Sequence, residues 1–125
     1  MKKTVLIIED DKDVQDFYEV ALDKFDVELI RAVNGRDAFR IIDSGKQIDL
    51  IVLDIVMPVM SGEEFLEELR NNRKLNLPVV VSSVLGIAAT RLQSVADIQG
   101  VFFKLDRIDE FQELVRKNLN LPDDE

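Results

Sequence analysis

Acidic, hydroxyl and basic side chains follow four short apolar segments of this chain. They are Glu9-Asp10-Asp11, Asp54, Ser82-Ser83 and Lys104. Magnesium ions prefer one or two carboxylates together with water and phosphate oxygens, and an aspartate can act as a nucleophile toward a phosphoryl group. A lysine and a hydroxyl can then hold the remaining phosphoryl oxygens. Together, these residue types indicate metal-assisted phosphoryl transfer to a carboxylate.

Asp54 ends the apolar run Ile51-Val52-Leu53. An ionised carboxylate is costly inside an apolar strand, so Asp54 must lie where the strand reaches the surface. A strand of this composition is typical of a parallel sheet that is buried on both faces. In such sheets ligands bind at the carboxyl ends of the strands. The four polar groups can therefore converge at one edge, although they are far apart in the sequence.

Five short segments with strand character alternate with five amphipathic segments. The predicted strands are Thr4–Ile8, Val27–Ala32, Leu50–Leu53, Val79–Ser82 and Val101–Phe103. Residues at helical spacing mark the predicted helices, and these are Val14, Phe17 and Ala21; Ala38, Ile41 and Ile42; Phe65, Leu66 and Leu69; Ile87, Arg91, Leu92 and Val95; and Ile108, Phe111, Leu114 and Val115. Asn34 is expected to cap the second helix and Ser61 the third. Repeated βα units predict a parallel sheet with helices on both faces.

Each polar group also has an ordinary structural explanation. The acidic group after the first strand can cap a helix, the serine pair can simply end a strand, and Lys104 can be a surface lysine. Asp54, which follows an apolar run, favours a functional role. Independent surface residues rarely fall at corresponding ends of four strands, so their joint occurrence favours one shared site.

Length and composition predict a single domain over residues 1–125, with an acidic tail from about residue 120. A chain of 125 residues with 46% apolar content is large enough for one domain with a hydrophobic core and too small for two domains. No run of about 18 apolar residues is present, so no membrane span is expected. The apolar part of the first strand is too short for a signal peptide, and a cytoplasmic location is expected. The absence of Cys excludes a disulfide framework and a thiolate metal site.

Charge and histidine content limit the partners of the chain. The net charge is −9, with 25 acidic and 16 basic residues, which argues against direct nucleic-acid binding because phosphate contacts need a basic surface. There is no histidine in the chain. Any phosphohistidine in its chemistry must therefore belong to another molecule.

The chain resembles the receiver domain of bacterial two-component response regulators, from Val5 to the last predicted helix. The motifs that carry this resemblance are Val5-Leu6-Ile7-Ile8-Glu9-Asp10-Asp11, Asp54-Ile55-Val56-Met57-Pro58-Val59-Met60-Ser61-Gly62, Pro78-Val79-Val80-Val81-Ser82-Ser83, and Gly100 through Lys104. The resemblance implies a flavodoxin-like, five-stranded parallel sheet in the order 2-1-3-4-5 with five helices on both faces.

The resemblance also implies a role for each site residue. Asp54 corresponds to the phosphoacceptor. The Mg²⁺ ligands correspond to Asp10, Asp54, the backbone carbonyl of Val56 and, through water, Glu9. Ser83 takes the place of the switch hydroxyl and Lys104 that of the phosphoryl-binding lysine, whereas Asp11 is expected to cap the first helix. The implied phosphoryl donor is a histidine kinase or a histidine phosphotransfer protein, and the implied output is contact with a downstream protein. The domain would catalyse transfer only onto its own Asp54.

Three positions depart from the family pattern. Leu105 stands where proline usually follows the lysine in a cis bond; a cis bond before a non-proline residue costs about 2.5–4 kcal/mol, so a trans bond is expected. Val101 stands where an aromatic residue usually moves with the switch hydroxyl, and Val84 replaces a small residue. Val101 and Phe103 are expected on one side of the fifth strand. There they form either an apolar partner surface or a surface covered by the fourth helix.

Two functional classes therefore remain open. The complete set of acidic, hydroxyl and lysine residues favours a working receiver that is switched by phosphorylation. Leu105 and Val101 favour a phosphorylation-independent interaction module, a pseudo-receiver. A phosphatase or mutase of the aspartyl-phosphate type is disfavoured, because those enzymes share a second Asp where this chain has Val56.

Overall fold

The computed structural model describes residues 2–54, 62–83, 100–103 and 108–121. Its strands are β1 (Lys3–Ile8), β2 (Val27–Ala32), β3 (Leu50–Asp54), β4 (Val79–Ser83) and β5 (Gly100–Phe103). Its helices are α1 (Lys12–Leu22), α2 (Gly35–Asp43), α3 (Gly62–Glu67), which continues into the π-helical turn η1 (Glu68–Asn72), and α5 (Ile108–Leu119). None of the helices in these ranges combines the length and apolar character that crossing a membrane requires.

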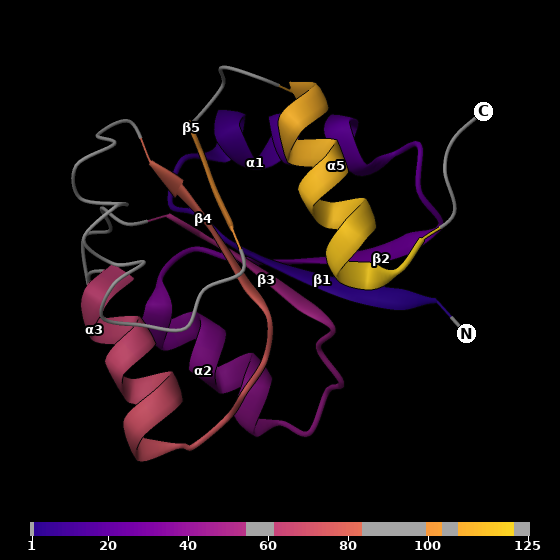
Figure 1. Cartoon of the computed structure of the whole chain (residues 1–125). Helices are drawn as coiled ribbons and strands as arrows, with labels where there is room; N and C mark the ends of the chain where they lie inside the picture. Colours follow the sequence, from indigo (N-terminus) through magenta and orange to yellow (C-terminus); the bar gives the residue numbers. More distant parts are fainter. Residues whose placement is uncertain (1, 55–61, 84–99, 104–107, 122–125) are drawn as a thin grey trace.

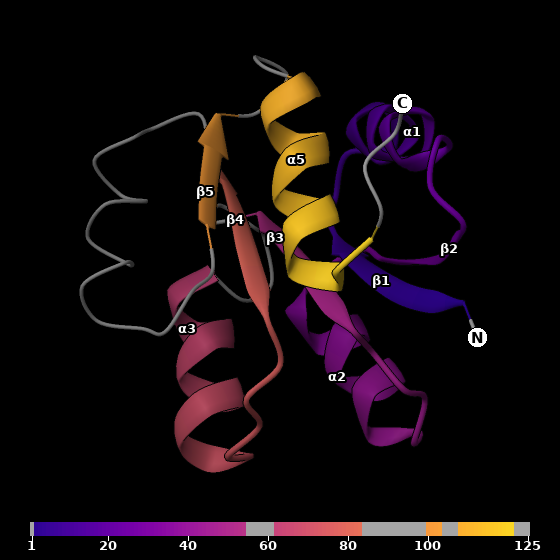
Figure 2. The same ribbon diagram turned by 45° about the vertical axis from the view of Figure 1, so that its right-hand side comes forward.

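The strands form one parallel sheet in the order β2-β1-β3-β4-β5. Helices α1 and α5 lie against one face of this sheet and α2 and α3 against the other (Figures 1 and 2). The prediction of a parallel sheet between two helical layers is confirmed. The expected helix marked by Ile87, Arg91, Leu92 and Val95 lies outside the described residues.

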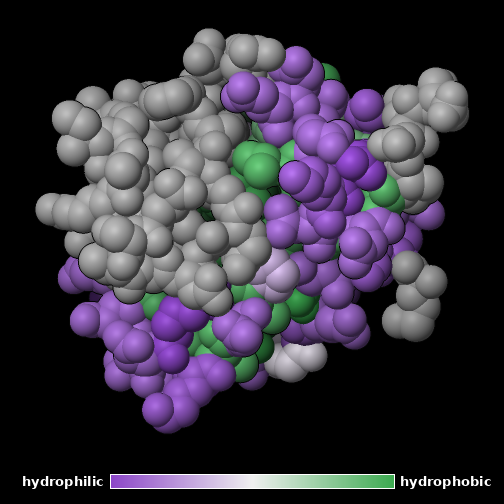
Figure 3. Space-filling model, in the orientation of Figure 1, coloured by the Kyte–Doolittle hydropathy of each residue, from purple (hydrophilic) through white to green (hydrophobic). Residues whose placement is uncertain are grey.

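Alternation along the central strands creates two separate cores, because successive side chains of a strand point to opposite faces. On β1, Leu6 and Ile8 pack with residues of α2 and α3. Val5 and Ile7 pack with residues of α1 and α5 on the other face. All four side chains are at most 1% exposed. Figure 3 shows hydrophilic residues over most of the coloured surface and hydrophobic ones in small patches between them.

The strand boundaries agree with the sequence expectation to within one residue. Asp54 and Ser83 are the last residues of β3 and β4 rather than the first residues after them. The end of the third helix was not predicted. Its last turn widens into a π-helix, in which the Arg73 amide donates to the Glu68 carbonyl at 2.9 Å. This turn brings the Arg73 guanidinium onto the ring of Phe39, 4.0 Å from its centroid.

The predicted cap of the second helix is confirmed. The Asn34 side-chain oxygen accepts a hydrogen bond of 2.8 Å from the Asp37 amide. Replacing such a cap by alanine leaves a helix N–H without its acceptor. We expect Asn34→Ala to lower the free energy of unfolding by about 1 kcal/mol, measured by urea denaturation. Asn34→Asp retains the acceptor and should stay close to the unaltered protein; an equal loss in both variants would contradict the capping role.

Candidate acidic site at the carboxyl edge of the sheet

The strand registers place four strand ends at one edge of the sheet. Ile8 pairs with Leu53, so the residues that follow them, Glu9 and Asp54, are level with each other. Asp54 is in turn level with Ser82 on β4. One residue further on, Ser83 is level with Phe103 at the end of β5. The polar segments that follow these strands therefore start from the same edge.

Three carboxylates meet at this edge. One oxygen from each of Glu9, Asp10 and Asp54 lies within 4.8 Å of the other two. Glu9 is fully buried and Asp54 is 4% exposed, whereas Asp10 is exposed to solvent. Three anionic groups at this spacing repel one another unless a cation lies between them. The cluster thus has the charge and the opening of a cation site.

The chemistry of the cluster fits Mg²⁺. All of its donors are carboxylate oxygens, which are hard ligands, and the exposed side of Asp10 leaves room for water or phosphate oxygens. Two oxygens on opposite sides of one Mg²⁺ lie roughly 4 Å apart, so small side-chain rotations would allow the cluster to share an ion. Such an ion would offset the repulsion among the three carboxylates.

Hydrogen bonds hold the turn between β1 and α1 that carries Glu9 and Asp10. The Glu9 amide donates to the Ala32 carbonyl of β2 at 3.0 Å. The Asp11 amide donates to Glu9 Oε2 at 3.2 Å. The Asp11 side chain caps α1, as predicted, by accepting from the amides of Asp13 and Val14 at 2.8 and 3.4 Å. The acidic pair is therefore attached both to β2 and to the start of α1.

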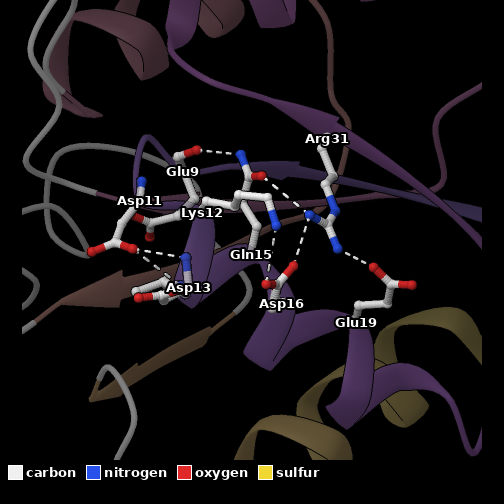
Figure 4. Close-up of polar contacts among 9 residues, drawn as sticks. Glu9, Asp11, Lys12, Asp13, Gln15, Asp16, Glu19 and Arg31 are labelled. Atoms are coloured by element: carbon white, nitrogen blue, oxygen red, sulfur yellow. Dashed lines mark hydrogen bonds and ion pairs between the residues drawn. The ribbon is translucent and has the colours of Figure 1, made fainter.

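A polar group that the sequence reasoning missed lies beneath this turn (Figure 4). Gln15 of α1 is only 6% exposed, and its Nε2 donates to the Glu9 carbonyl at 2.6 Å. Arg31 of β2 reaches the same side chain and also pairs with Asp16 at 3.0 Å and with Glu19. The hydrogen bond from Arg31 holds the pKa of Asp16 below its usual value, so this carboxylate remains ionised beside the guanidinium.

The remaining predicted site residues fall in two groups. Ser82, Ser83, Val101 and Phe103 are described by their positions on β4 and β5. Outside the described residues lie Val56, Val84, Lys104 and Leu105. The structure thus brings together Glu9, Asp10 and Asp54 by their side chains and Ser83 by its strand position.

The chain belongs to the response regulator receiver domain family, whose model matches residues 5–116. Domains of this family are signalling modules of two-component systems rather than metabolic enzymes. This membership agrees with the parallel sheet and with the acidic cluster at its carboxyl edge.

Relatives with curated descriptions are longer proteins. The chain is 34% identical over 80 residues to the transcriptional regulatory protein YrkP of Bacillus subtilis (strain 168), covering 64% of this chain and 33% of that protein. It is 31% identical over 83 residues to the response regulator GtcR of Aneurinibacillus migulanus, covering 66% of this chain and 33% of that protein. The chain therefore spans about a third of the length of these relatives.

A solved structure matches nearly all of the fold. The response regulator protein TrrA of Thermotoga maritima, determined in complex with Mg²⁺ and BeF, superposes with a TM-score of 0.82 at 28% identity. The match covers 94% of this chain and 99% of the TrrA chain. The flavodoxin-like receiver fold is thereby established for this protein.

Proposed function

We propose that this chain is a phosphoacceptor receiver domain, in which Asp54 accepts a phosphoryl group from a phosphohistidine of a partner kinase or phosphotransfer protein. The observation that carries the proposal is the cluster of Glu9, Asp10 and Asp54 oxygens within 4.8 Å of one another. The relative TrrA, which has the same fold, was determined with Mg²⁺ and BeF. Mg²⁺ is accordingly proposed as the cofactor.

The proposed transfer uses the chain's own Asp54 as nucleophile. A carboxylate oxygen of Asp54 forms a bond to phosphorus while the phosphorus–nitrogen bond of the donor phosphohistidine breaks, and the electron pair of that bond returns to the imidazole. Asp10, Asp54 and the carbonyl of Val56 are the proposed metal ligands, and Glu9 acts mainly through water. Lys104 is proposed to hold a phosphoryl oxygen.

The proposed output is a change of protein contacts. A phosphoryl group adds about −1.5 to −2 charge at the acidic cluster. Ser83, the last residue of β4, is proposed to donate a hydrogen bond from its hydroxyl to this group. We propose that this hydrogen bond biases the expected fourth helix and the fifth strand toward a second arrangement. Val101 and Phe103 on β5 are then either a downstream partner surface or covered by that helix. We propose that this chain acts in the cytoplasm. Its net charge of −9 disfavours contact between this chain and nucleic acid.

Intact mass after incubation with acetyl phosphate tests the proposed function. We expect one Mg²⁺-dependent phosphoryl addition in the unaltered chain and none in Asp54→Asn, because the amide is not a nucleophile for phosphorus. Asp49→Asn is the matched control: Asp49 precedes β3 at the opposite edge, and its loss should leave the addition intact.

The pseudo-receiver is the second candidate, favoured by Leu105 and Val101 at the altered switch positions. It predicts no phosphoryl addition under any of these conditions in a chain whose circular dichroism shows that it is folded. It also predicts that partner binding is unchanged in Asp54→Asn. The acetyl phosphate experiment therefore separates the two functions directly.

A further inference from the structure

Gln15 is a buried polar side chain that the proposed transfer does not use. It lies on α1, is 6% exposed, and directs its Nε2 at the Glu9 carbonyl, 2.6 Å away. Its Oε1 accepts from Nη1 of Arg31 at 3.4 Å (Figure 4). A buried amide has to satisfy both its donor and its acceptor, and Gln15 does so with partners from the turn after β1 and from β2.

These partners define one orientation of the amide. Turning it over would place Oε1 against the Glu9 carbonyl, two acceptors together, and the amide NH₂ against the guanidinium, two donors together. Arg31 thus fixes the orientation of the Gln15 amide in which its Nε2 donor faces the Glu9 carbonyl. Arg31 is itself held by Asp16 at 3.0 Å and by Glu19.

Gln15 forms hydrogen bonds with both ends of the acidic segment Glu9-Asp10-Asp11. Its backbone amide donates to the Asp11 carbonyl at 3.0 Å, and its side chain donates to the Glu9 carbonyl. Asp10 lies between these two attachment points. Loss of the side-chain bond would leave the Glu9 carbonyl without this donor and would loosen one attachment of the segment that holds two carboxylates of the cluster, while the Glu9 amide stays bonded to Ala32.

We infer that Gln15, oriented by Arg31, is a positioning residue that sets the Mg²⁺ affinity of the Glu9, Asp10 and Asp54 cluster; this inference rests on the proposed magnesium site. Groups that orient metal ligands without touching the metal typically change metal affinity by about 10–100-fold when they are removed. Gln15 acts here through the backbone of the ligand segment.

The test is an amide-resolved NMR titration with MgCl₂ at constant ionic strength, which does not depend on phosphorylation. Gln15→Met keeps the length and approximate shape of the side chain and removes the donor. We expect its Mg²⁺ dissociation constant to rise by about 10-fold or more. Gln112→Met is the matched control, because Gln112 Nε2 makes the same kind of bond, 2.9 Å to the Ala21 carbonyl, between α5 and α1. Its dissociation constant should equal that of the unaltered chain.

Arg31→Gln provides a second test in which electrostatics and positioning have opposite signs. Removing this cation near the acidic cluster should tighten Mg²⁺ binding if charge alone matters. Weaker binding in Arg31→Gln supports the positioning role, and tighter binding overturns it. If Gln15→Met does not fold, the Mg²⁺ dissociation constant of Arg31→Gln tests the positioning role in its place. An unchanged dissociation constant in a folded Gln15→Met also overturns the inference.

Asp10→Asn separates this inference from the proposed function. Saturable Mg²⁺ binding that is lost in Asp10→Asn supports the magnesium site, whatever Gln15→Met does. No saturable binding in the unaltered chain overturns the proposed magnesium site and the inference with it.

Discussion

Asp54→Asn is expected to make the Mg²⁺-free domain more stable, although it removes the proposed phosphoacceptor. Asp54 is 4% exposed, and its carboxylate lies within 4.8 Å of carboxylate oxygens of Glu9 and Asp10. Like charges about 4 Å apart repel by about 4 kcal/mol at an effective dielectric constant of about 20. Water around the exposed Asp10 screens part of this repulsion. We expect Asp54→Asn to raise the free energy of unfolding by about 1–3 kcal/mol, which thermal denaturation would show as several degrees.

The same variant should lose most of the stabilisation by Mg²⁺. An ion that binds only the folded state adds about 2.7 kcal/mol at a concentration of 100 times its dissociation constant. Denaturation with and without Mg²⁺ therefore shows two opposite effects of the variant: Asp54→Asn is the more stable protein without the ion, and it gains less stability when the ion is added. Equal gains in both proteins would contradict the metal site.

Asp49→Asn is the matched control for this experiment, because Asp49 immediately precedes β3 and Asp54 ends it. The Asp49 carboxylate accepts from the Thr4 amide at 2.7 Å, while the Asp49 amide donates to the Thr4 carbonyl at 2.9 Å. Removing its charge weakens a favourable hydrogen bond instead of relieving repulsion. We expect Asp49→Asn to destabilise the domain and to leave the Mg²⁺ gain unchanged. If Asp49→Asn were also more stable, the less negative net charge of the chain, rather than relief of repulsion in the cluster, would explain the stability of Asp54→Asn.

Phe65→Ala is expected to be among the most destabilising single changes in the core beneath α2 and α3. Phe65 is fully buried and stacks on Phe39, with ring centroids 4.6 Å apart and 22° between the planes. Arg73 lies over the Phe39 ring and pairs with Asp43 at 2.8 Å. Truncating a buried Phe removes its transfer free energy and leaves a cavity, at a cost of about 3–5 kcal/mol. Urea denaturation should show this loss.

Phe17→Ala provides the comparison for Phe65→Ala. Phe17 of α1 is only partly buried and contacts Tyr18 edge to face, with ring centroids 5.6 Å apart. Its truncation removes less buried area, so we expect a clearly smaller loss in the free energy of unfolding. If the two losses were equal, burial of the Phe39–Phe65 stack could not be the main source of stability on that face.

The sheet and two helix caps could be predicted from sequence because their causes are local. Apolar runs such as Ile51-Val52-Leu53 indicate a strand buried on both faces. Asn34 and Asp11 cap helices that begin with the next residue. Their side-chain oxygens accept from backbone amides that lie two or three residues further along the chain. These features depend on periodicity and on short-range hydrogen bonds.

The π-helical turn and the role of Gln15 could not be predicted, because they depend on partners that are distant in sequence. Arg73 bonds to Asp43, 30 residues earlier, and Arg31 meets Gln15 across 16 residues. In a helix containing Val14 and Phe17, a glutamine would ordinarily be assigned to the solvent side. One signal was present: Gln15 lies four residues after Asp11, and helical side chains lean toward the preceding turn.

The attachment of Glu9 has an evolutionary consequence. Its amide donates to the Ala32 carbonyl and its carbonyl accepts from Gln15, so two hydrogen bonds of this position use backbone atoms. Such attachments are the same for every residue type except proline at the amide. The chemistry of the ninth side chain can therefore be exchanged while the path of the chain is retained. A replacement of similar size at this buried position would change the ion preference of the cluster and keep both backbone hydrogen bonds.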